Sequence, residues 1–222
     1  SGWFEFYQNN QNENLNLSEQ FTFQIWFSGD STATTYAPCI INLNDDSNNL
    51  AIYKNPSIET NLMIYSNSIF QEEKIDTLNL NNQNEFHLLS IVQDTSNVKV
   101  YINNILIFNQ ESTMTIDNII VGGSLNTNNE TENLWYGYID EIRLWNTALT
   151  QNIITLHHEY KYKVSSSYDD VYLDYLIGLW DFRLNTIDET PVNIWQDINN
   201  HEFYTILYTV ESMSNELSIV GR

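Results

Sequence analysis

Two neighbouring carboxylic acids, Asp140 and Glu141, stand inside the otherwise apolar stretch YGYIDEIRLW at residues 136–145. Two carboxylates on one face of a strand could supply the acid and the nucleophile of a glycoside hydrolase. Adjacent strand residues point to opposite faces, so this pair lacks that geometry. The apolar residues on either side of the acids are out of phase, which predicts a β-bulge and an ion pair with Arg143. The stretch therefore indicates a structural role.

Other catalytic patterns are missing from the sequence. It contains no G-x-S-x-G, H-E-x-x-H or Walker loop. His157 and His158 would lie about 100° apart on a helix, which is unsuitable for joint zinc binding. Cys39 is the single cysteine and lies in the apolar run APCIINL, which predicts a buried, inert thiol. These features favour a protein that is not an enzyme.

Amide and aromatic side chains occur together in several polar segments, and this combination suits carbohydrate. Aromatic rings stack on the apolar face of a sugar, while amides and carboxylates bind its hydroxyl groups. Core packing is the competing interpretation for each aromatic residue. The predicted ligand-binding residues are Trp135, Tyr136, Asn126, Asn128, Tyr36, Trp195 and Asp197.

The charge balance excludes several classes of partner. Among 222 residues, 29 are acidic and 8 are basic, which gives a net charge of -21. Nucleic acids and anionic membrane surfaces require clustered Lys and Arg, so neither is expected as a partner. No run approaches the roughly 18 apolar residues of a membrane span, so membrane insertion is not expected either. The many carboxylates are compatible with calcium binding.

Alternation of apolar and polar residues, the pattern of antiparallel strands, dominates the chain. Asn103-Asn104 fits a two-residue hairpin turn, and Thr150 begins a helical pattern. Predicted strands lie at residues 21–29, 38–43, 50–54, 62–66, 86–93, 98–108, 116–123, 136–145, 178–184 and 203–210. The sequence thus predicts an all-β, two-sheet antiparallel jelly-roll sandwich with one short helix near 150–160. We expect one domain over 1–222, in which 161–222 adds completing strands to the same sandwich.

The stretch YGYIDEIRLWNTALTQNII at 136–154 resembles a signature of laminin G-like and pentraxin-like jelly rolls, within the concanavalin A-like lectin/glucanase superfamily. That signature reads G-x-I-D-E-hydrophobic-R-hydrophobic-W/Y-N-x-A-L-S/T-x-x-x-I. Four further pieces agree in order: FTFQIWF, EFHLLSIVQDTSNVKVYINNILI, NIIVGG and GLWDFRLN. Phe86 replaces the usual Trp, and Asn104 replaces the usual Gly. The resemblance covers most of residues 4–185 and implies the fold more strongly than any one function.

The resemblance to pentraxins also implies a calcium site at one rim of a sheet. In those relatives, an Asp/Asn pair before one strand and an acidic loop before the G-x-I-D strand hold the metal. The matching positions here are Asp45, Asp46, Asn48, Asn49, Asn126, Asn128, Glu130 and Glu132. The pair directly before the strand is Asn48-Asn49, and the second loop is shorter than in pentraxins. Polar turns without metal are therefore the alternative interpretation.

Together these features predict a non-catalytic recognition or adhesion module that binds a glycan or glycoprotein, with calcium as a candidate cofactor. We expect it in a larger secreted or surface protein, outside the cell or on the surface of a cell or particle. One alternative is a structural spacer or assembly domain of an appendage or viral particle, assembled with itself or other chains. A toxin receptor-binding subdomain is another.

Overall fold

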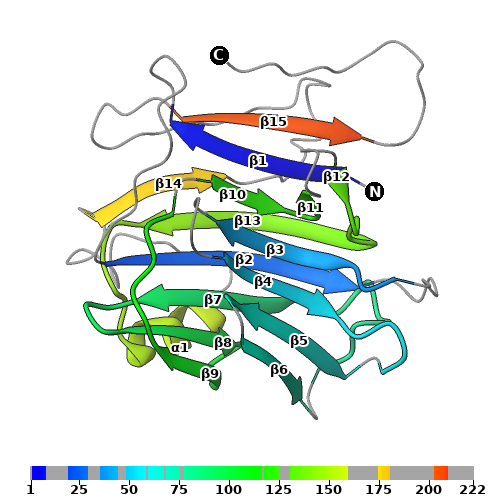
Figure 1. Ribbon diagram of the computed structural model, residues 1–222, viewed down its shortest axis with the longest axis horizontal. Coiled ribbons are helices and arrows are strands. Elements are labelled where there is room, and N and C mark those ends of the chain that lie inside the picture. The colour runs from blue at the N-terminus through cyan, green and yellow to red at the C-terminus, as the bar shows by residue number, and fades with distance from the viewer. Residues whose placement is uncertain are drawn as a thin grey trace.

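Two antiparallel sheets packed face to face make up the molecule, with α1 on the outside of one of them (Figure 1). The computed structural model describes residues 2–8, 20–29, 36–44, 49–58, 60–67, 69–75, 78–116, 118–125, 131–159, 175–180 and 203–209. The predicted jelly-roll sandwich with one short helix is confirmed within these residues.

The larger sheet has seven described strands in the order β15-β1-β10-β3-β4-β5-β6. Their bounds are β1 Gly2–Gln8, β3 Cys39–Asn44, β4 Asn49–Lys54, β5 Asn61–Ser66, β6 Ile69–Lys74, β10 Asn118–Val121 and β15 Phe203–Thr209. Sequence analysis missed β1 and β6. The missed β6 (IFQEEK) is mostly charged or polar and is a sheet edge, so it lacks the alternation that marks a half-buried strand.

The smaller sheet has six described strands in the order β14-β13-β2-β7-β8-β9, and β11 and β12 form a separate two-stranded ribbon. Their bounds are β2 Phe21–Gly29, β7 His87–Gln93, β8 Asn97–Ile102, β9 Ile105–Glu111, β11 Ser124–Leu125, β12 Thr131–Glu132, β13 Gly137–Trp145 and β14 Leu176–Trp180. Strands from the last third of the chain thus extend both sheets, since β14 pairs with β13 and β15 pairs with β1.

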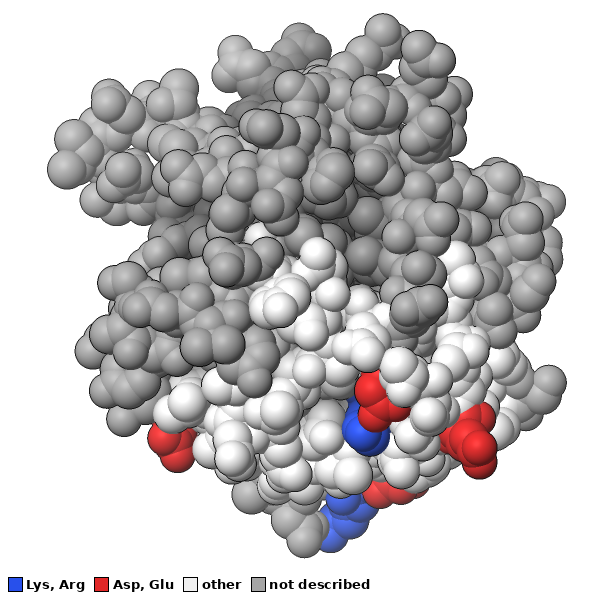
Figure 2. All heavy atoms as spheres, turned by 90° about the vertical axis from the view of Figure 1, so that its left-hand side faces the viewer, with Lys and Arg blue, Asp and Glu red and all other residues white. Residues whose placement is uncertain are grey.

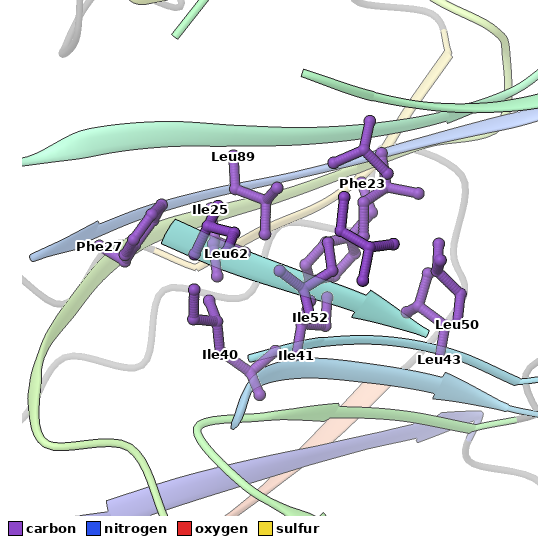
Figure 3. Packing of buried hydrophobic residues seen from close by; sticks show 14 of the residues in the cluster. Phe23, Ile25, Phe27, Ile40, Ile41, Leu43, Leu50, Ile52, Leu62 and Leu89 are labelled. Atoms are coloured by element: carbon purple, nitrogen blue, oxygen red, sulfur yellow. The ribbon is translucent and has the colours of Figure 1, made fainter. Parts of the chain in front are cut away.

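The core lies between the two sheets (Figure 3). Alternate residues of β2 point into it and face the inner residues of β3, β4 and β5, as the period of two predicts. The labelled side chains from these strands and β7 are Phe23, Ile25, Phe27, Ile40, Ile41, Leu43, Leu50, Ile52, Leu62 and Leu89, all fully buried.

The second face of β2 differs from the prediction. We expected a half-buried strand, but all nine residues of β2 are buried. Helix α1 (Gln151–Glu159) and the segment before it cover this outer face. Gln24 bonds His157 at 2.8 Å, and Thr22 Oγ1 donates to the carbonyl of Thr147 at 2.8 Å. The alternating polar residues of β2 therefore hydrogen-bond to α1 and to the segment before it instead of facing water.

Three local predictions are confirmed. The β8–β9 hairpin turns at Asn103, whose φ is 59°. Helix α1 follows directly after Thr150. The register of β13 against β2 shifts between Asp140 and Arg143, which is the expected bulge. None of the helices in the described part of the chain has the length and apolar character needed to cross a membrane.

Candidate functional site

A groove of about 370 Å³ lies on the outer face of the seven-stranded sheet, over β4 and β5. The residues that line it are Ala37, Asn49, Ala51, Tyr53, Tyr65, Asn67 and Asn133. We call it the β4–β5 groove. It is on the face of the sandwich opposite α1, which packs against the six-stranded sheet. Its volume falls in the range of small-molecule sites, about 300–1,000 Å³.

Strand alternation places these side chains together. Leu50 and Ile52 of β4 are in the core, so the intervening Ala51 points outward. Ala51 is directly opposite Tyr65 of β5, and residues opposite one another share a face. The small Ala51 side chain forms the floor, and larger residues on either side form the walls.

The walls are aromatic. The rings of Tyr53 and Tyr65 meet edge to face, with centroids 5.4 Å apart and an interplanar angle of 87°. Phe70 of β6 continues this cluster, with its ring centroid 4.8 Å from that of Tyr65. Tyr65 keeps 40% of its surface exposed and Phe70 53%. Ring faces of this kind are available for stacking on a ligand.

The Tyr53 side chain lies near Ser124 and Cys39. Burial raises the pKa of Tyr53, and the neighbouring Cys39 raises it further, so the phenol stays neutral and can donate. Ser124 Oγ accepts from Asn133 Nδ2 at 3.0 Å. Tyr53 is therefore next to a hydrogen bond that positions one of the groove's amides.

Amide groups stand at both ends of the groove. At the start of β4, Asn49 N–H donates to Asn67 Oδ1 at 2.9 Å, and Asn67 N–H donates to the Asn49 carbonyl at 2.8 Å. Asn67 and Asn133 have φ values of 53° and 52°, which Asn tolerates better than most residues. At the other end, the carbonyl of Asn133 accepts from Cys39 N–H at 2.7 Å. None of the seven described lining residues is charged.

Asn42 of β3 adds a buried polar group beside the floor. It is directly opposite Ala51, so it lies on the outer face of the sheet, and only 4% of its surface is exposed. Its Oδ1 atom has no hydrogen-bond partner among the described residues. This atom is enclosed and Asn42 does not line the groove, so it is not accessible to a ligand there.

The family of the chain follows from comparison with known proteins. A profile of the Concanavalin A-like lectin/glucanases superfamily, of the laminin G type, matches residues 6–155. The chain belongs to this superfamily. The resemblance to laminin G-like domains is thereby confirmed. Comparison with curated proteins gives no match.

Several solved structures share the fold of this superfamily member. A candidate carbohydrate-binding protein from Bacteroides ovatus has 12% identity over 96% of this chain and 58% of its own, with a TM-score of 0.58. The SAP-like pentraxin from Limulus polyphemus has 13% identity over 71% of this chain and 81% of its own, with a TM-score of 0.48. Domain 4 of AbnA, an extracellular arabinanase from Geobacillus stearothermophilus solved with arabinotriose, has 22% identity over 64% of this chain and 68% of its own, with a TM-score of 0.47.

At these identities the similarity shows the fold alone. The name of the superfamily covers both lectins and glucanases.

Two predicted binding residues of this concanavalin A-like domain, Tyr36 and Tyr136, meet although they are 100 positions apart. Their hydroxyl groups hydrogen-bond at 2.7 Å, and their ring centroids are 6.2 Å apart. Partial burial, followed by this hydrogen bond, raises the pKa of Tyr36 to about 12. Tyr36 is exposed and directly precedes Ala37 of the groove, so the pair stands next to one end of it.

The interpretation of Trp135 as a stacking residue is corrected. Its side chain is only 1% exposed, its Nε1 donates to the carbonyl of Ser28 at 3.2 Å, and its ring packs edge to face on Phe27. Gly137, with φ 148°, allows this close packing, because a Cβ there would collide with the Ser28 carbonyl and come within 2.8 Å of Trp135 Nε1. Trp135 belongs to the core and has no face to offer a sugar.

Of the predicted calcium ligands, the structure describes Asn49 and Glu132. Asn49 lines the groove, and Glu132 is exposed and accepts from Asn133 Nδ2 at 3.2 Å. Both offer the oxygen atoms that calcium prefers, although no cluster of three acidic, His or Cys side chains occurs among the described residues. The other predicted calcium ligands lie outside the described residues: Asp45, Asp46, Asn48, Asn126, Asn128 and Glu130. The predicted sugar-binding residues Trp195 and Asp197 also lie outside them.

Glu141, the second acid of the Asp140-Glu141 pair, has a structural role. Glu141 is buried at the bulge with a φ of 42°, and its Oε1 accepts from Arg143 Nε at 2.9 Å and from Nη2. Arg143 is fully buried. The predicted ion pair is confirmed, and the Glu141 carboxylate serves as the partner of Arg143.

Charge is sparse on the surface that Figure 2 shows. The described part of this face is mostly uncharged, with separate acidic groups and basic groups close to acidic ones. Among the described residues, Lys99 Nζ and Asp94 Oδ2 form an ion pair at 2.6 Å.

Sequence reasoning missed the central residues of the groove: Tyr53, Tyr65, Asn67 and Asn133, with Phe70 beside them. Tyr53 and Tyr65 lie in strands that were predicted, but as members of apolar runs. The phase of those strands holds a signal, because a residue between two core positions must point outward.

Proposed function

We propose that this domain is a non-catalytic recognition module that binds a glycan, free or on a glycoprotein, in the β4–β5 groove. The observation that carries the proposal is the combination of aromatic walls, uncharged amide ends and a small floor residue in one groove. Sugars present apolar ring faces and outward hydroxyl groups, and this groove offers a matching partner for each.

The amides determine which groups of the sugar would be recognised. The Asn49 side chain carries a donor and an acceptor, so it can bind a hydroxyl group in either role. Asn133 Nδ2 already donates to Ser124 and Glu132, so Asn133 offers its Oδ1 acceptor. Asn49 and Asn133 stand at opposite ends of the groove, with the tyrosine rings between them. A ligand would therefore stack in the middle and hydrogen-bond at both ends.

The positions of the carboxyl groups in the described residues support a non-catalytic role. Glycoside hydrolysis requires two carboxyl groups on either side of the scissile bond, about 5–9.5 Å apart. The described residues that line the groove include no Asp or Glu, and Glu141 is bound to Arg143.

We further propose that calcium binds at the rim of the groove, with Glu132 as one of its ligands. Glu132 accepts a hydrogen bond from Asn133 of the groove, and its negative charge contributes to raising the pKa of Tyr53. A cation there would order the rim and could bind ligand hydroxyls directly. Such a module would act outside the cell or on a surface, as part of a larger protein. The spacer or assembly role and the toxin receptor-binding role predicted from sequence remain the alternatives.

The test is a glycan array followed by calorimetric titration of the best ligand. We expect Tyr65→Ala to weaken binding about tenfold or more, because a stacking surface is lost. Tyr138→Ala is the matched control: Tyr138 is 56% exposed but lies on β13 of the other sheet. Equal effects of the two substitutions would refute the groove as the site. A wild-type protein that binds no glycan would leave the spacer role favoured.

A further inference from the structure

Phe70 is an exposed aromatic residue that the groove itself does not explain. It lies on the edge strand β6, with 53% of its surface exposed, and its ring packs against Tyr65 rather than into the core. Folding gains little from an aromatic ring held at the surface, whereas a ligand could cover it.

Phe70 ends a straight row of side chains that crosses the sheet. Asn42 is directly opposite Ala51, Ala51 is opposite Tyr65, and Tyr65 is opposite Phe70. All four therefore share the outer face of β3, β4, β5 and β6. Strands are about 4.8 Å apart, so the row is roughly 14 Å long. That length exceeds what a single sugar ring needs.

We propose that this row is an extended binding surface for an internal stretch of an uncharged polysaccharide chain, with Phe70 as a second stacking platform. The inference rests on the proposed function of the groove and specifies its ligand class. The chain would lie across the strands, with one sugar over the exposed ring of Tyr65 and the next ones over Phe70.

The two ends of the row differ, and the difference points to a chain that continues beyond the site. At the inner end, Asn42 is buried, so the row is closed on that side. At the outer end, β6 is the last strand of this sheet among the described residues. A long ligand can leave over Phe70 without a steric barrier from the sheet.

Charge favours an uncharged chain. None of the four residues in the row is charged, and the nearest acid on the same face, Glu72, accepts hydrogen bonds from Asn55 at 2.8 Å and Asn61 at 2.6 Å. The protein carries a net charge of -21, which repels polyanions such as uronate or sulfated polymers.

The experiment is calorimetric titration of the whole chain with neutral β-linked gluco-, xylo- and manno-oligosaccharides, each from dimer to hexamer, with oligogalacturonate as the charged control. We expect affinity to rise with length in at least one neutral series and oligogalacturonate not to bind. Phe70→Ala should weaken hexamer binding about tenfold and leave dimer binding unchanged.

Further variants separate stacking from general apolar contact. Phe70→Tyr keeps the ring and should retain hexamer binding, whereas Phe70→Leu keeps an apolar side chain and should lose it. Ile105→Ala removes an exposed apolar residue from the other sheet and should change nothing. Thermal melting of each variant checks that it is folded.

The outcomes distinguish this inference from the proposed function. If the glycan array finds ligands but affinity is independent of length, or Phe70→Ala weakens dimers and hexamers equally, the extended surface is refuted and the groove remains. If no neutral series binds while a charged glycan does, the ligand class is refuted. If no glycan binds at all, both proposals fail.

Discussion

The buried pair of Glu141 and Arg143 gives a prediction of large effect. Arg143 is fully buried and Glu141 nearly so, and the guanidinium donates twice to one carboxylate oxygen. Glu141→Gln keeps the shape of the side chain but removes its charge. The buried guanidinium then loses the negative charge of this partner, and breaking a buried pair in this way costs about 3–5 kcal/mol.

The expected loss is a large part of the total. A domain of this size has a free energy of unfolding of roughly 5–15 kcal/mol. Each kcal/mol corresponds to a shift in Tm of about 2–4 °C for a chain of this length, so Tm should fall by roughly 6–20 °C. Glycan affinity at a temperature where the variant is folded should not change, because the pair lies on β13, in a different sheet from β4 and β5 of the groove.

The assay is urea unfolding and thermal melting of Glu141→Gln, Arg143→Met and the double variant. Glu111→Gln is the matched control, since Glu111 is an exposed acid on a strand and should change stability by no more than about 0.5 kcal/mol. The double variant removes both charges of this pair, so it should be at least about 1 kcal/mol more stable than the sum of the single losses predicts. Additive losses, or a Glu141→Gln effect no larger than that of the control, would refute this reasoning.

Three further outcomes are expected. Gly29→Ala should destabilise the fold by about 1–3 kcal/mol or more in urea unfolding, because its Cβ would overlap the backbone carbonyl of Leu80. The Lys99 hydrogen bond lowers the pKa of Asp94 from 3.8 to about 2, so its stabilising effect is present above pH 3.8 and is lost as pH falls towards 2; Asp94→Asn should flatten the decline in Tm over that window. Calcium at 100 times its Kd should add about 2.7 kcal/mol to the free energy of unfolding, and an unchanged Tm with calcium and with chelator would contradict the rim site.

Features set by a few neighbouring residues could be predicted from sequence. The bulge followed from a phase change around Asp140 and Glu141, and the hairpin turn followed from Asn103-Asn104, whose first residue tolerates positive φ. The order of the motifs identified the superfamily. The bulge and the turn each depend on one short stretch, and the motifs depend only on their order along the chain, so no knowledge of distant contacts was needed.

The groove could not be predicted in the same way, because it depends on cross-strand register. Tyr53 and Tyr65 look like core residues in LAIYK and LMIYS, and only the pairing of Ala51 with Tyr65 shows that they share an outer face. The same limit explains the error at Trp135. Its neighbouring amides suggested a binding loop, whereas a contact with Ser28, 107 positions away, draws it into the core.

The two outer faces of the sandwich differ in how far they are covered, and this difference indicates which face contacts a ligand. Helix α1 covers the outer face of the six-stranded sheet and buries Trp145 there. The outer face of the seven-stranded sheet leaves Tyr65 and Phe70 exposed instead. Edge strands are usually protected by charge, and the second half of β6, Glu72 to Lys74, follows that rule. Its first half carries Phe70 and does not, although a charged residue there would cost the fold little. An aromatic ring at a position where a charge would favour solubility is expected if that position contacts a ligand.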